Sequence, residues 1–545
     1  MNSTRIVAAV AFAVSLFLLL DAWNKTQRPV PDAGLSANRV TSNPHGQASG
    51  ETLSAAPAMD SSKVLEKGKR IQIATDLMVA EIDTVGGDIR RLEFVTHKDT
   101  FDQSKGFLLL KDDEPPLFVV QSGISGTEVP NHKSKFVEES VDHALKEGSD
   151  HLVIRLRSEI IGGLQLIKTY EFSRGSYLIG VSMEVANRGA HSVAPVGYFQ
   201  LLRDSAVAAG ESSMVPTFTG VGIYTDAGKY QKFSFSDLDK GKIDYPQRAE
   251  DGWIGFVQHY FVGAWVPDAR TNRDYYAQAL GNGLYRAGLK ISAGAVEPGR
   301  SASIKSSVYV GPQEQRKLAL LSPGLDLTVD YGWLTVIASP LFSVLSAIFR
   351  FVGNWGIAII ILTMLIKLLF YPLSATSYRS MAKMRVLAPK MQKLKEQFGD
   401  DRQKMQQSMM ELYKTEKINP LGGCLPIVVQ IPVFISLYWV LLGSVELRHA
   451  PFYGWIHDLS VKDPLYILPV LMGLTMILQT RLNPEPPDPV QAKVMKIMPI
   501  VFSVFFFFFP AGLVLYWLVN NILSIAQQWL ITRNVEQPNA TRPRR

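Results

Sequence analysis

Two kinds of hydrophobic pattern divide the chain. Across residues 63–325, short runs of apolar and polar residues alternate, as in SYLIGVSMEVANRG, where Val181 and Met183 point to one side. Alternation with a period of two is typical of half-buried β-strands, and glycine pairs such as Gly86-Gly87 mark turns between the runs. This region is therefore predicted to form an antiparallel β-sandwich.

The N-terminal part is predicted to contain an anchor and a linker. An apolar run follows Arg5, and the DAWN motif after it offers no small-x-small site for signal peptidase. Residues 1–24 are therefore expected to be an uncleaved transmembrane anchor, with Asp21 and Trp23 at the far interface. Residues 25–62 are rich in Pro, Ser, Ala and Gly without periodicity, which is typical of a disordered linker.

Long apolar segments fill the C-terminal part of the chain. Five of them are predicted to span a membrane, at residues 353–373, 421–442, 465–479, 497–509 and 511–531. The loop at 374–420 carries ten basic residues, which indicates the cytoplasmic side. A further apolar segment within 326–352 is predicted to lie flat as an interfacial amphipathic helix, because a span there would turn this basic loop outward.

Together these segments predict a multi-domain membrane protein with six α-helical spans and a large periplasmic β-sandwich between spans one and two. The last four spans lie within residues 421–531, and the basic tail at 532–545 falls on the cytoplasmic side. Both termini are therefore expected in the cytoplasm. The spans at 465–479 and 497–509 are short, roughly 20 Å each, so they are expected to thin the bilayer locally.

Composition excludes several classes of function. The net charge of +7 is modest for 545 residues, and the basic residues concentrate in one loop and the tail, so no nucleic-acid binding is expected. The single cysteine, Cys424, allows no intramolecular disulfide. The nine histidines show no metal-ligand spacing, and the sequence has no phosphate loop or nucleophile elbow, so no metal, cofactor or catalytic residue is predicted.

The last apolar segment carries many polar residues. They are Tyr516, Trp517, Asn520, Asn521, Ser524, Gln527 and Gln528, within GLVLYWLVNNILSIAQQWL. Steps of three and four place them on one stripe of a helix, while leucine and isoleucine cover the rest. A polar stripe in lipid is costly unless it faces other protein or water, so this stripe is expected to face one of these.

The segment at 353–373 contains one charge, Lys367, with Thr363 one turn before it and Tyr371 one turn after it on the same helix face. Lys367 stands about 7 Å from the cytoplasmic end, so its ammonium can snorkel to the interface. The alternative is a hydrated cavity that exposes the ammonium to acidic ligands. In that case Gln430, Lys367 and the polar stripe are expected to satisfy one another around a wet groove.

The basic loop is predicted to form two polar, methionine-rich helices separated by Gly399-Asp400, with Asp400-Asp401 as the cap of the second. A charged, solvated pair of helices is one interpretation. Contact of its methionine-rich side with varied hydrophobic partners is the other.

Several long motifs follow one another along the chain. They include MAKMRVLAPKMQKLKEQFGDD, NPLGGCLPIVVQIPVFISLY, GSVELRHAPFYGWIHDLS and KIMPIVFSVFFFFFPAGLVLYW, with DGWIGFVQHYFVGAWVP in the β-rich part. These motifs resemble the YidC family of bacterial membrane-protein insertases, over essentially the whole chain. The large β-rich part resembles that of Gram-negative members, which implies a location in the inner membrane with this domain in the periplasm.

The resemblance also implies a site. The family has a five-helix core around a hydrophilic groove that is open to the cytosol and to lipid and closed toward the periplasm. The expected groove residues are Thr363, Lys367, Gln430, Tyr516, Trp517, Asn520, Asn521 and Ser524, and by resemblance Thr363 and Trp517 contact the passing substrate. Lys367 stands where the family usually has arginine, which keeps the charge but loses the guanidinium fork.

Two further sets of residues are expected to act with the groove. Pro432, Phe434, Phe505, Phe506 and Phe509 are expected to form a hydrophobic slide that guides the apolar segment of a client protein into lipid. By resemblance, the cytoplasmic hairpin recruits the substrate or ribosome complexes, with Lys383, Arg385, Lys390, Lys393 and Lys395 as its basic residues.

The leading hypothesis is a non-enzymatic insertase and chaperone that inserts, folds and helps assemble integral inner-membrane proteins, alone or with the Sec translocon. Its expected partners are nascent membrane proteins, the Sec translocon with its periplasmic accessory subunits, ribosome or signal-recognition components, and membrane lipid. A secondary transporter is one alternative, but it predicts paired repeats with broken spans that the apolar segments do not show. A membrane-anchored periplasmic carbohydrate-active enzyme is another, and it requires paired carboxylates about 5–10 Å apart.

Overall fold

The computed structural model describes residues 65–100, 102–207, 217–398, 401–416, 425–483 and 489–536. All of them belong to one compact unit, Ser54–Arg545. The predicted anchor at 1–24 and the linker at 25–62 lie outside the described residues, as does the end of the basic tail after residue 536.

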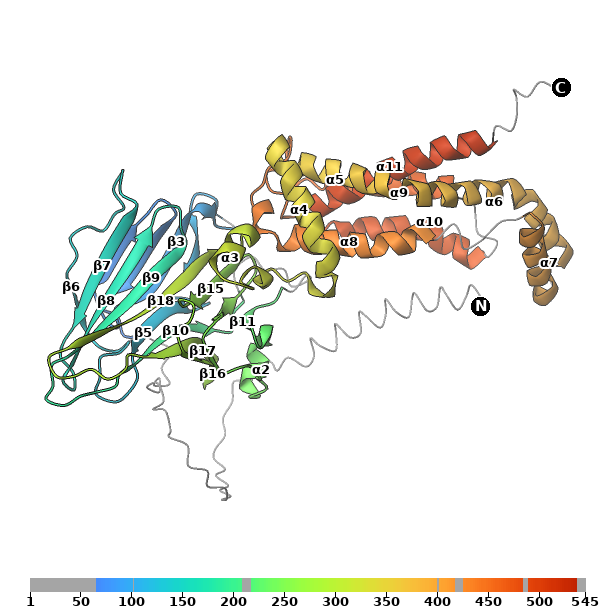
Figure 1. Ribbon diagram of the computed structural model, residues 1–545. Coiled ribbons are helices and arrows are strands. Elements are labelled where there is room, and N and C mark those ends of the chain that lie inside the picture. Colours follow the sequence, from blue (N-terminus) through green and yellow to red (C-terminus); the bar gives the residue numbers. More distant parts are fainter. Residues whose placement is uncertain are drawn as a thin grey trace, which may run out of the picture. The chain divides into compact units, whose positions relative to one another are not determined.

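The region predicted to be β-rich forms two antiparallel sheets of nine strands each (Figure 1). The first sheet has the order β1-β2-β3-β5-β10-β17-β16-β13, with β4 beside β3. Its strands are β1 (Arg70–Ala74), β2 (Met78–Asp83), β3 (Asp88–Lys98), β4 (Gly106–Leu110), β5 (Phe118–Ile124), β10 (Val196–Asp204), β13 (Arg248–Ala249), β16 (Arg273–Gly281) and β17 (Leu284–Ser292).

The second sheet has the order β12-β11-β14-β15-β18-β9-β8-β7-β6. Its strands are β6 (Phe136–Glu138), β7 (His151–Ser158), β8 (Leu164–Ser173), β9 (Leu178–Asn187), β11 (Gly220–Thr225), β12 (Lys229–Ser234), β14 (Trp253–Val257), β15 (Phe261–Val266) and β18 (Ser301–Pro312). The prediction of an antiparallel β-sandwich is confirmed.

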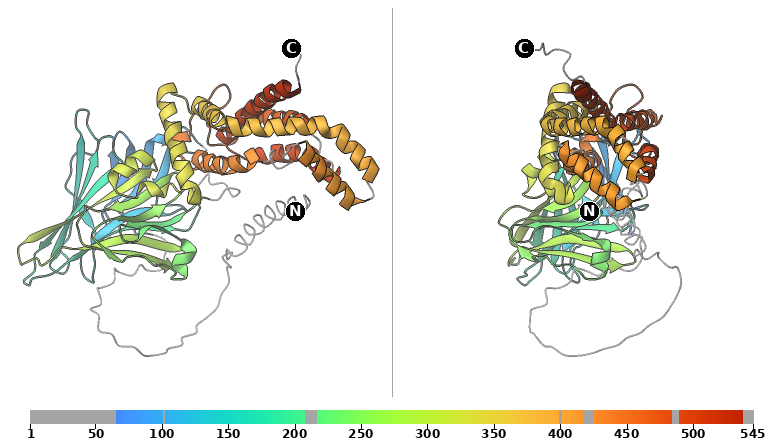
Figure 2. Two further views of the ribbon diagram at one scale, coloured as in Figure 1. Left: turned by 45° about the vertical axis from the view of Figure 1, so that its right-hand side comes forward. Right: turned by 90° about the vertical axis from the view of Figure 1, so that its right-hand side faces the viewer.

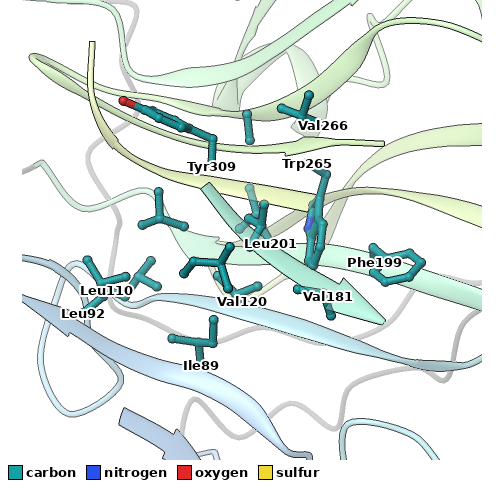
Figure 3. Close-up of a cluster of buried hydrophobic side chains, with 14 of the residues drawn as sticks. Ile89, Leu92, Leu110, Val120, Val181, Phe199, Leu201, Trp265, Val266 and Tyr309 are labelled. Carbon is teal, nitrogen blue, oxygen red and sulfur yellow. The ribbon is translucent and has the colours of Figure 1, made fainter. Parts of the chain in front are cut away.

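The two sheets meet in one hydrophobic core. Val181 and Met183, which the alternation placed on one side of a strand, are both buried in it. Figure 3 shows how Ile89 and Leu201 of the first sheet lie near Trp265 of the second. Trp265 has no exposed surface, and burial of so large an apolar side chain contributes several kcal/mol at about 25 cal/mol per Å².

A buried lysine also joins the two sheets. The Lys168 ammonium, on β8, donates to the carbonyl oxygens of Gly86 at 2.6 Å and Ser122 at 2.7 Å, and lies 3.4 Å from an Asp88 carboxylate oxygen. Gly86 has φ +83°, a conformation that favours glycine, so the predicted turn at Gly86-Gly87 also presents a carbonyl to the lysine. These oxygens offset the cost of burying the ammonium.

Helices form most of the rest of the structure. Short ones are α2 (Phe235–Asp239), α3 (Gln315–Leu321), η1 (Asp326–Thr328), η2 (Gly332–Leu334) and η4 (Val445–Leu447). The longer ones are α4 (Thr335–Val352), α5 (Trp355–Leu369), α6 (Tyr371–Phe398), α7 (Arg402–Thr415), α8 (Leu425–Gly443), α9 (Ile467–Leu482), α10 (Pro489–Phe506) and α11 (Ala511–Glu536). α9 packs against both α10 and α11, and α11 also packs against α5, α6 and α8.

Helix α4 has a direction of its own. In Figures 1 and 2 it runs across the direction that α5, α8 and α11 share. Gly332–Val352 is nevertheless the one described helix that is both long and apolar enough to cross a membrane, and the bent pair of α5 and the start of α6 passes the same test when joined. The interfacial position of α4 and the count of six spans therefore stay predictions.

One detail of the predicted segments is wrong. The helix at 353–373 does not continue to Tyr371, because α5 ends at Leu369 and α6 starts after a bend of 67°. Tyr371 therefore does not continue the face of Thr363 and Lys367. Helix α10 has 18 residues, but its first turns carry Lys493 and Lys496 ahead of the apolar segment, so the short span at 497–509 stays a prediction.

The connection between α8 and α9 contacts the β-sandwich through Arg448. One Arg448 guanidinium nitrogen donates to the Thr100 hydroxyl at 3.0 Å. The guanidinium carbon lies 5.0 Å from the ring centre of Phe107 and 5.5 Å from that of Phe261. The two rings are stacked on each other, with their centres 4.3 Å apart, and the guanidinium lies near both of them. It gains cation–π attraction while keeping a hydrogen bond, so this side chain fastens the connection to the sandwich.

A buried histidine makes a second contact with the end of α8. His259 Nε2 donates to the Leu442 carbonyl oxygen at 2.9 Å, which requires a proton on that nitrogen. Burial lowers the pKa of His259 to about 4, and burial lowers the pKa of the nearby His97 to about 4 as well. Both imidazoles therefore stay neutral at neutral pH.

These two histidines predict a loss of stability in acid. With folded pKa values below the ordinary value of 6.5, the free energy of unfolding is highest above pH 6.5 and falls as the pH drops toward 4. His259→Gln keeps a donor for the Leu442 carbonyl but does not titrate. At pH 5 this variant should therefore retain up to about 2 kcal/mol of the unfolding free energy that the parent protein loses.

The melting temperature of the full chain in detergent, at pH 7.5 and pH 5.0, measures this effect. His191→Gln is the matched control, because His191 is exposed. An equal fall in melting temperature for the parent, His191→Gln and His259→Gln proteins would contradict the prediction.

Candidate functional site

The side chain of Lys367, the charged residue of α5, points toward α11. Lys367 Nζ donates to the Ser524 hydroxyl at 2.7 Å, and that hydroxyl donates to the backbone carbonyl of Asn520 at 2.7 Å. Lys367 is 4% exposed and Ser524 is 3% exposed. A snorkelling lysine would carry its ammonium to the interface, whereas here the ammonium turns toward α11. The hydrated cavity of the alternative interpretation stays a prediction.

The partner of this ammonium is neutral. Within the part of the chain that the structure describes, no carboxylate forms an ion pair with Lys367. A buried ammonium whose bonded neighbour is a hydroxyl keeps much of its desolvation cost. A carboxylate that reached this ammonium would therefore stabilise it strongly by forming an ion pair.

Two other polar side chains of α11, Asn520 and Asn521, also meet partners on neighbouring helices. Gln430 Nε2, on α8, donates to the Asn520 side-chain oxygen at 3.5 Å. Asn521 Nδ2 donates to the Thr475 hydroxyl, on α9, at 3.5 Å. Both contacts are long, so they are weak hydrogen bonds. They nevertheless show that the polar stripe faces α8 and α9 as well as α5.

The stripe also reaches the end of α9. Gln528 Nε2 donates to the Leu482 carbonyl oxygen and to the Asn483 side-chain oxygen, both at 3.0 Å. Gln527, beside it, is partly buried. The stripe predicted from the sequence therefore acts in large part as polar contact between helices.

The remaining predicted groove residues have different surroundings. The Thr363 hydroxyl donates to the Ile359 carbonyl of its own helix at 2.6 Å, and Thr363 is 1% exposed. Tyr516 is 3% exposed, and Trp517 is partly buried. Trp517 lies at the junction between the polar stripe and a cluster of aromatic rings.

The predicted slide residues form much of that aromatic cluster. The Phe434 and Trp517 ring centres are 4.4 Å apart, and those of Phe506 and Trp517 are 5.4 Å apart. Phe509 lies 4.7 Å from Phe505 and 5.4 Å from Phe506. Pro432 lies inside α8, and its carbonyl accepts the Ser436 hydroxyl at 2.8 Å. The structure thus brings Phe434, Phe505, Phe506, Phe509 and Trp517 into one aromatic cluster.

The predicted hairpin is formed by α6 and α7. The Asp401 carboxylate accepts the backbone N–H groups of Gln403 and Lys404, so the predicted cap of the second helix is present. Lys390 pairs with Glu416 at 2.7 Å, which joins α6 to the end of α7. Lys383 and Lys393 are exposed, and the side chain of Lys395 lies outside the description.

Three residues of the site were not found from the sequence. Arg385 was assigned to recruitment, yet it donates to the Arg481 and Leu482 carbonyls at the end of α9. Tyr378, on α6, lies close to the same Ser524 that binds Lys367. Thr475, on α9, accepts a hydrogen bond from Asn521. A polar residue in an apolar segment indicates such a contact, so the sequence contained a signal for this residue.

The β-sandwich contains a shallow cavity of about 220 Å³ lined in part by charged residues. Of these, Glu93 pairs with Arg91 at 3.1 Å, and Glu114 pairs with Lys111 at 2.9 Å. Each of these carboxylates is paired with a basic side chain, so the two do not form the pair of carboxylates that a carbohydrate-active enzyme requires. In the described residues no group of three or more His, Cys, Asp or Glu side chains could hold a metal ion.

Two family models match the chain. The model described as 60Kd inner membrane protein matches residues 347–538, and the model described as YidC periplasmic domain matches residues 70–344. Together they cover the β-sandwich and the helices described above.

Curated relatives match the chain along its whole length. The membrane protein insertase YidC of Methylobacillus flagellatus is 54% identical over 99% of this chain and 99% of its own length. That of Aromatoleum aromaticum is 53% identical over 98% of both chains. A crystal structure of an active YidC insertase, 16% identical, covers 85% of this chain and 93% of its own with a TM-score of 0.39.

The solved structure has a TM-score below 0.5, so the assignment rests on the sequence relatives and the family models. Identity above half of all positions over nearly the full length of both chains shows common membership. The chain belongs to the YidC family of membrane protein insertases, as an inner-membrane member with a periplasmic β-sandwich domain.

Proposed function

We propose that the chain inserts, folds and helps assemble integral proteins of the inner membrane. Its relatives are named membrane protein insertases, and they match it over nearly the full length. This family membership sets aside the transporter and the carbohydrate-active enzyme as alternatives and agrees with the absence of a catalytic role. The observation in the structure that carries the proposal is the buried ammonium of Lys367 against a neutral hydroxyl.

The proposed site is a hydrophilic groove, open to the cytosol and to lipid, among α5, α8, α9, α10 and α11. Its polar side is formed by Lys367, Gln430, Asn520, Asn521 and Ser524. Hydrogen bonds join Lys367 to Ser524, Ser524 to the Asn520 carbonyl and Gln430 to the Asn520 side chain, and Asn521 bonds to Thr475. Thr363 and Tyr516 belong to the same wall. An acidic residue of an entering client replaces Ser524 as the partner of the ammonium, which recovers part of the cost of burying that charge.

The aromatic surface around Trp517 is the proposed slide. It joins Phe434 and Phe506 to the end of the polar stripe, so a client segment can leave the polar residues along one continuous apolar face. Phe505, Phe509 and Pro432 extend this face. The driving force is burial of the client in lipid, about 0.8 kcal/mol for each CH₂ group, and no nucleotide is needed.

The proposed topology has six spans with both termini in the cytoplasm. The basic hairpin of α6 and α7 supports a cytoplasmic position for these helices. The direction of α4, across that of α5, α8 and α11, supports its assignment as an interfacial helix (Figure 1). Exposed Trp333 and Phe351, near its two ends, suit the membrane–water interface.

The proposed partners follow from this arrangement. Nascent membrane proteins and lipid meet the site itself. Ribosome or signal-recognition components meet the exposed lysines of the hairpin, Lys383 and Lys393, with Lys390 and Lys395 on the same helix. The Sec translocon and its periplasmic accessory subunits meet the β-sandwich side.

The charge of Lys367 can be tested with clients whose leading tail is acidic. Lys367→Arg keeps the charge and should insert such clients within about twofold of the parent, whereas Lys367→Glu should insert them at least about tenfold more slowly, a difference of about 1.4 kcal/mol. The measurement is protease protection of radiolabelled clients in proteoliposomes.

A client with its acidic residues changed to amides is the matched control and should lose most of the difference between the variants. Equal insertion of the acidic client by the Lys367→Glu and parent proteins would show that the charge of Lys367 takes no part.

A second prediction concerns the β-sandwich. Deletion of residues 70–312 removes both sheets but none of the proposed groove, so insertion by the shortened chain should stay within about twofold of the parent. Co-purification with the Sec translocon should weaken. Loss of insertion by a stably expressed deletion would place an essential part of the site in the sandwich.

A further inference from the structure

The last carbonyl oxygens of α9 are held from two sides. Arg385 Nη2, on α6, donates to the Arg481 carbonyl at 3.2 Å and to the Leu482 carbonyl at 3.1 Å. Gln528, on α11, donates to the same Leu482 carbonyl and to the Asn483 side chain, both at 3.0 Å. Three helices that are distant in sequence therefore meet at one helix end.

This arrangement suits the chemistry of a helix C-terminus. The last four carbonyls of a helix have no partner within it and carry partial negative charge. A guanidinium is always charged and presents its donors in a rigid fork, so it can hold two neighbouring carbonyls at once. The bonds join residues 96 and 97 positions apart, so they fix the place of α6 against the helices of the proposed groove.

A second attachment of α6 lies next to the charge in the groove. Tyr378 lies close to Ser524, the residue that also binds the Lys367 ammonium. Ser374 and Ser377, on the same part of α6, are 5% and 3% exposed. The start of α6 is therefore packed beside Lys367. The two attachments use Ser524 and Gln528, which are one helical turn apart on α11.

We propose that Arg385 and Gln528 form a clasp on the end of α9 that holds α6 across the cytoplasmic approach to Lys367. With the clasp formed, the ammonium is closed off, as its 4% exposure shows. With the clasp released, α6 moves away from Ser524 and an entering segment reaches the charge. Arg385 and Gln528 are thus positioning residues, and this inference rests on the proposed function because it assigns the movement to client entry.

The test measures access to the site directly. Thr363 is one turn from Lys367 and 1% exposed, and its hydroxyl donates to the Ile359 carbonyl of its own helix. Thr363→Cys therefore reports access without breaking the contact of Lys367 with Ser524. The single native cysteine is removed first, as Cys424→Ser. The rate of alkylation by a charged, membrane-impermeant maleimide is then followed from the cytoplasmic face of membrane vesicles.

Loss of the clasp should speed this reaction. Arg385→Gln and Gln528→Leu should each raise the rate about tenfold or more, equivalent to about 1.4 kcal/mol of lost closure. Arg379→Gln is the matched control, because Arg379 is an exposed arginine on the same helix, and its rate should stay within about twofold of the parent. Equal rates for the Arg385→Gln and Arg379→Gln proteins would overturn the proposal.

Two further measurements separate opening from unfolding. Ser436, on α8, has no exposed surface, so Ser436→Cys should remain unreactive in the clasp variants if only α6 has moved. A rise at Ser436→Cys equal to that at Thr363→Cys would mean general loosening and would also overturn the proposal. If Arg385→Gln fails to fold, Gln528→Leu and Arg385→Lys provide the test. Unchanged alkylation rates at Thr363→Cys in both of these variants would reject the clasp.

The insertion assay keeps this result apart from the proposed function. If the clasp variants open the site but Lys367→Glu still inserts acidic clients at the parent rate, the clasp stands and the role of Lys367 fails. If Lys367→Glu blocks acidic clients while the clasp variants react no faster than the control, the role of Lys367 stands and the clasp fails.

Discussion

The burial of one ammonium group sets the requirements for much of the helical part. A charge in an apolar helix is costly, and among the residues that the structure describes Lys367 offsets part of that cost with the hydroxyl of Ser524. Ser524 in turn needs α11 to carry polar residues where lipid-facing residues would otherwise stand. The Asn and Gln residues along α11 then need partners on α8 and α9, which they find in Gln430 and Thr475.

The same polar residues decide which helices pack together. Without a hydrophobic driving force in lipid, helices associate through close packing and hydrogen bonds, and α11 offers such bonds to α5, α8 and α9. The β-sandwich follows a different rule, because a large aqueous domain gains stability by burying apolar side chains such as Trp253 and Trp265. Arg448 joins the two parts with a cation–π contact that suits an aqueous boundary.

The sequence contained most of the local information. Period-two alternation located the strands, because the buried face of a sheet repeats every second residue, and the spacing of Asn520, Asn521 and Ser524 revealed one helix face. The Asp401 cap was also visible, because a cap involves residues only two and three positions away. These features depend on near neighbours in the chain.

The contacts that were missed depend on distant neighbours. Tyr371 was placed on the face of Lys367 because an uninterrupted helix was assumed, although Pro372 is a local signal for the 67° bend, since proline ends or kinks a helix at the residues before it. Arg385 looked like one more basic residue of a solvated hairpin. Its role depends on where α9 ends, almost one hundred residues later, and sequence periodicity carries no information about that distance.

The lysine itself explains how one site can be closed yet reactive. An ammonium is a compact charge with donors that rotate freely, so it can rest against a hydroxyl and, once α6 has moved away, turn to a carboxylate. A guanidinium is planar and has five donors to satisfy, so a single serine would leave more of them unpaired. The hydroxyl of Ser524 is thus a sufficient resting partner for Lys367, and a weak enough one for a client carboxylate to replace it.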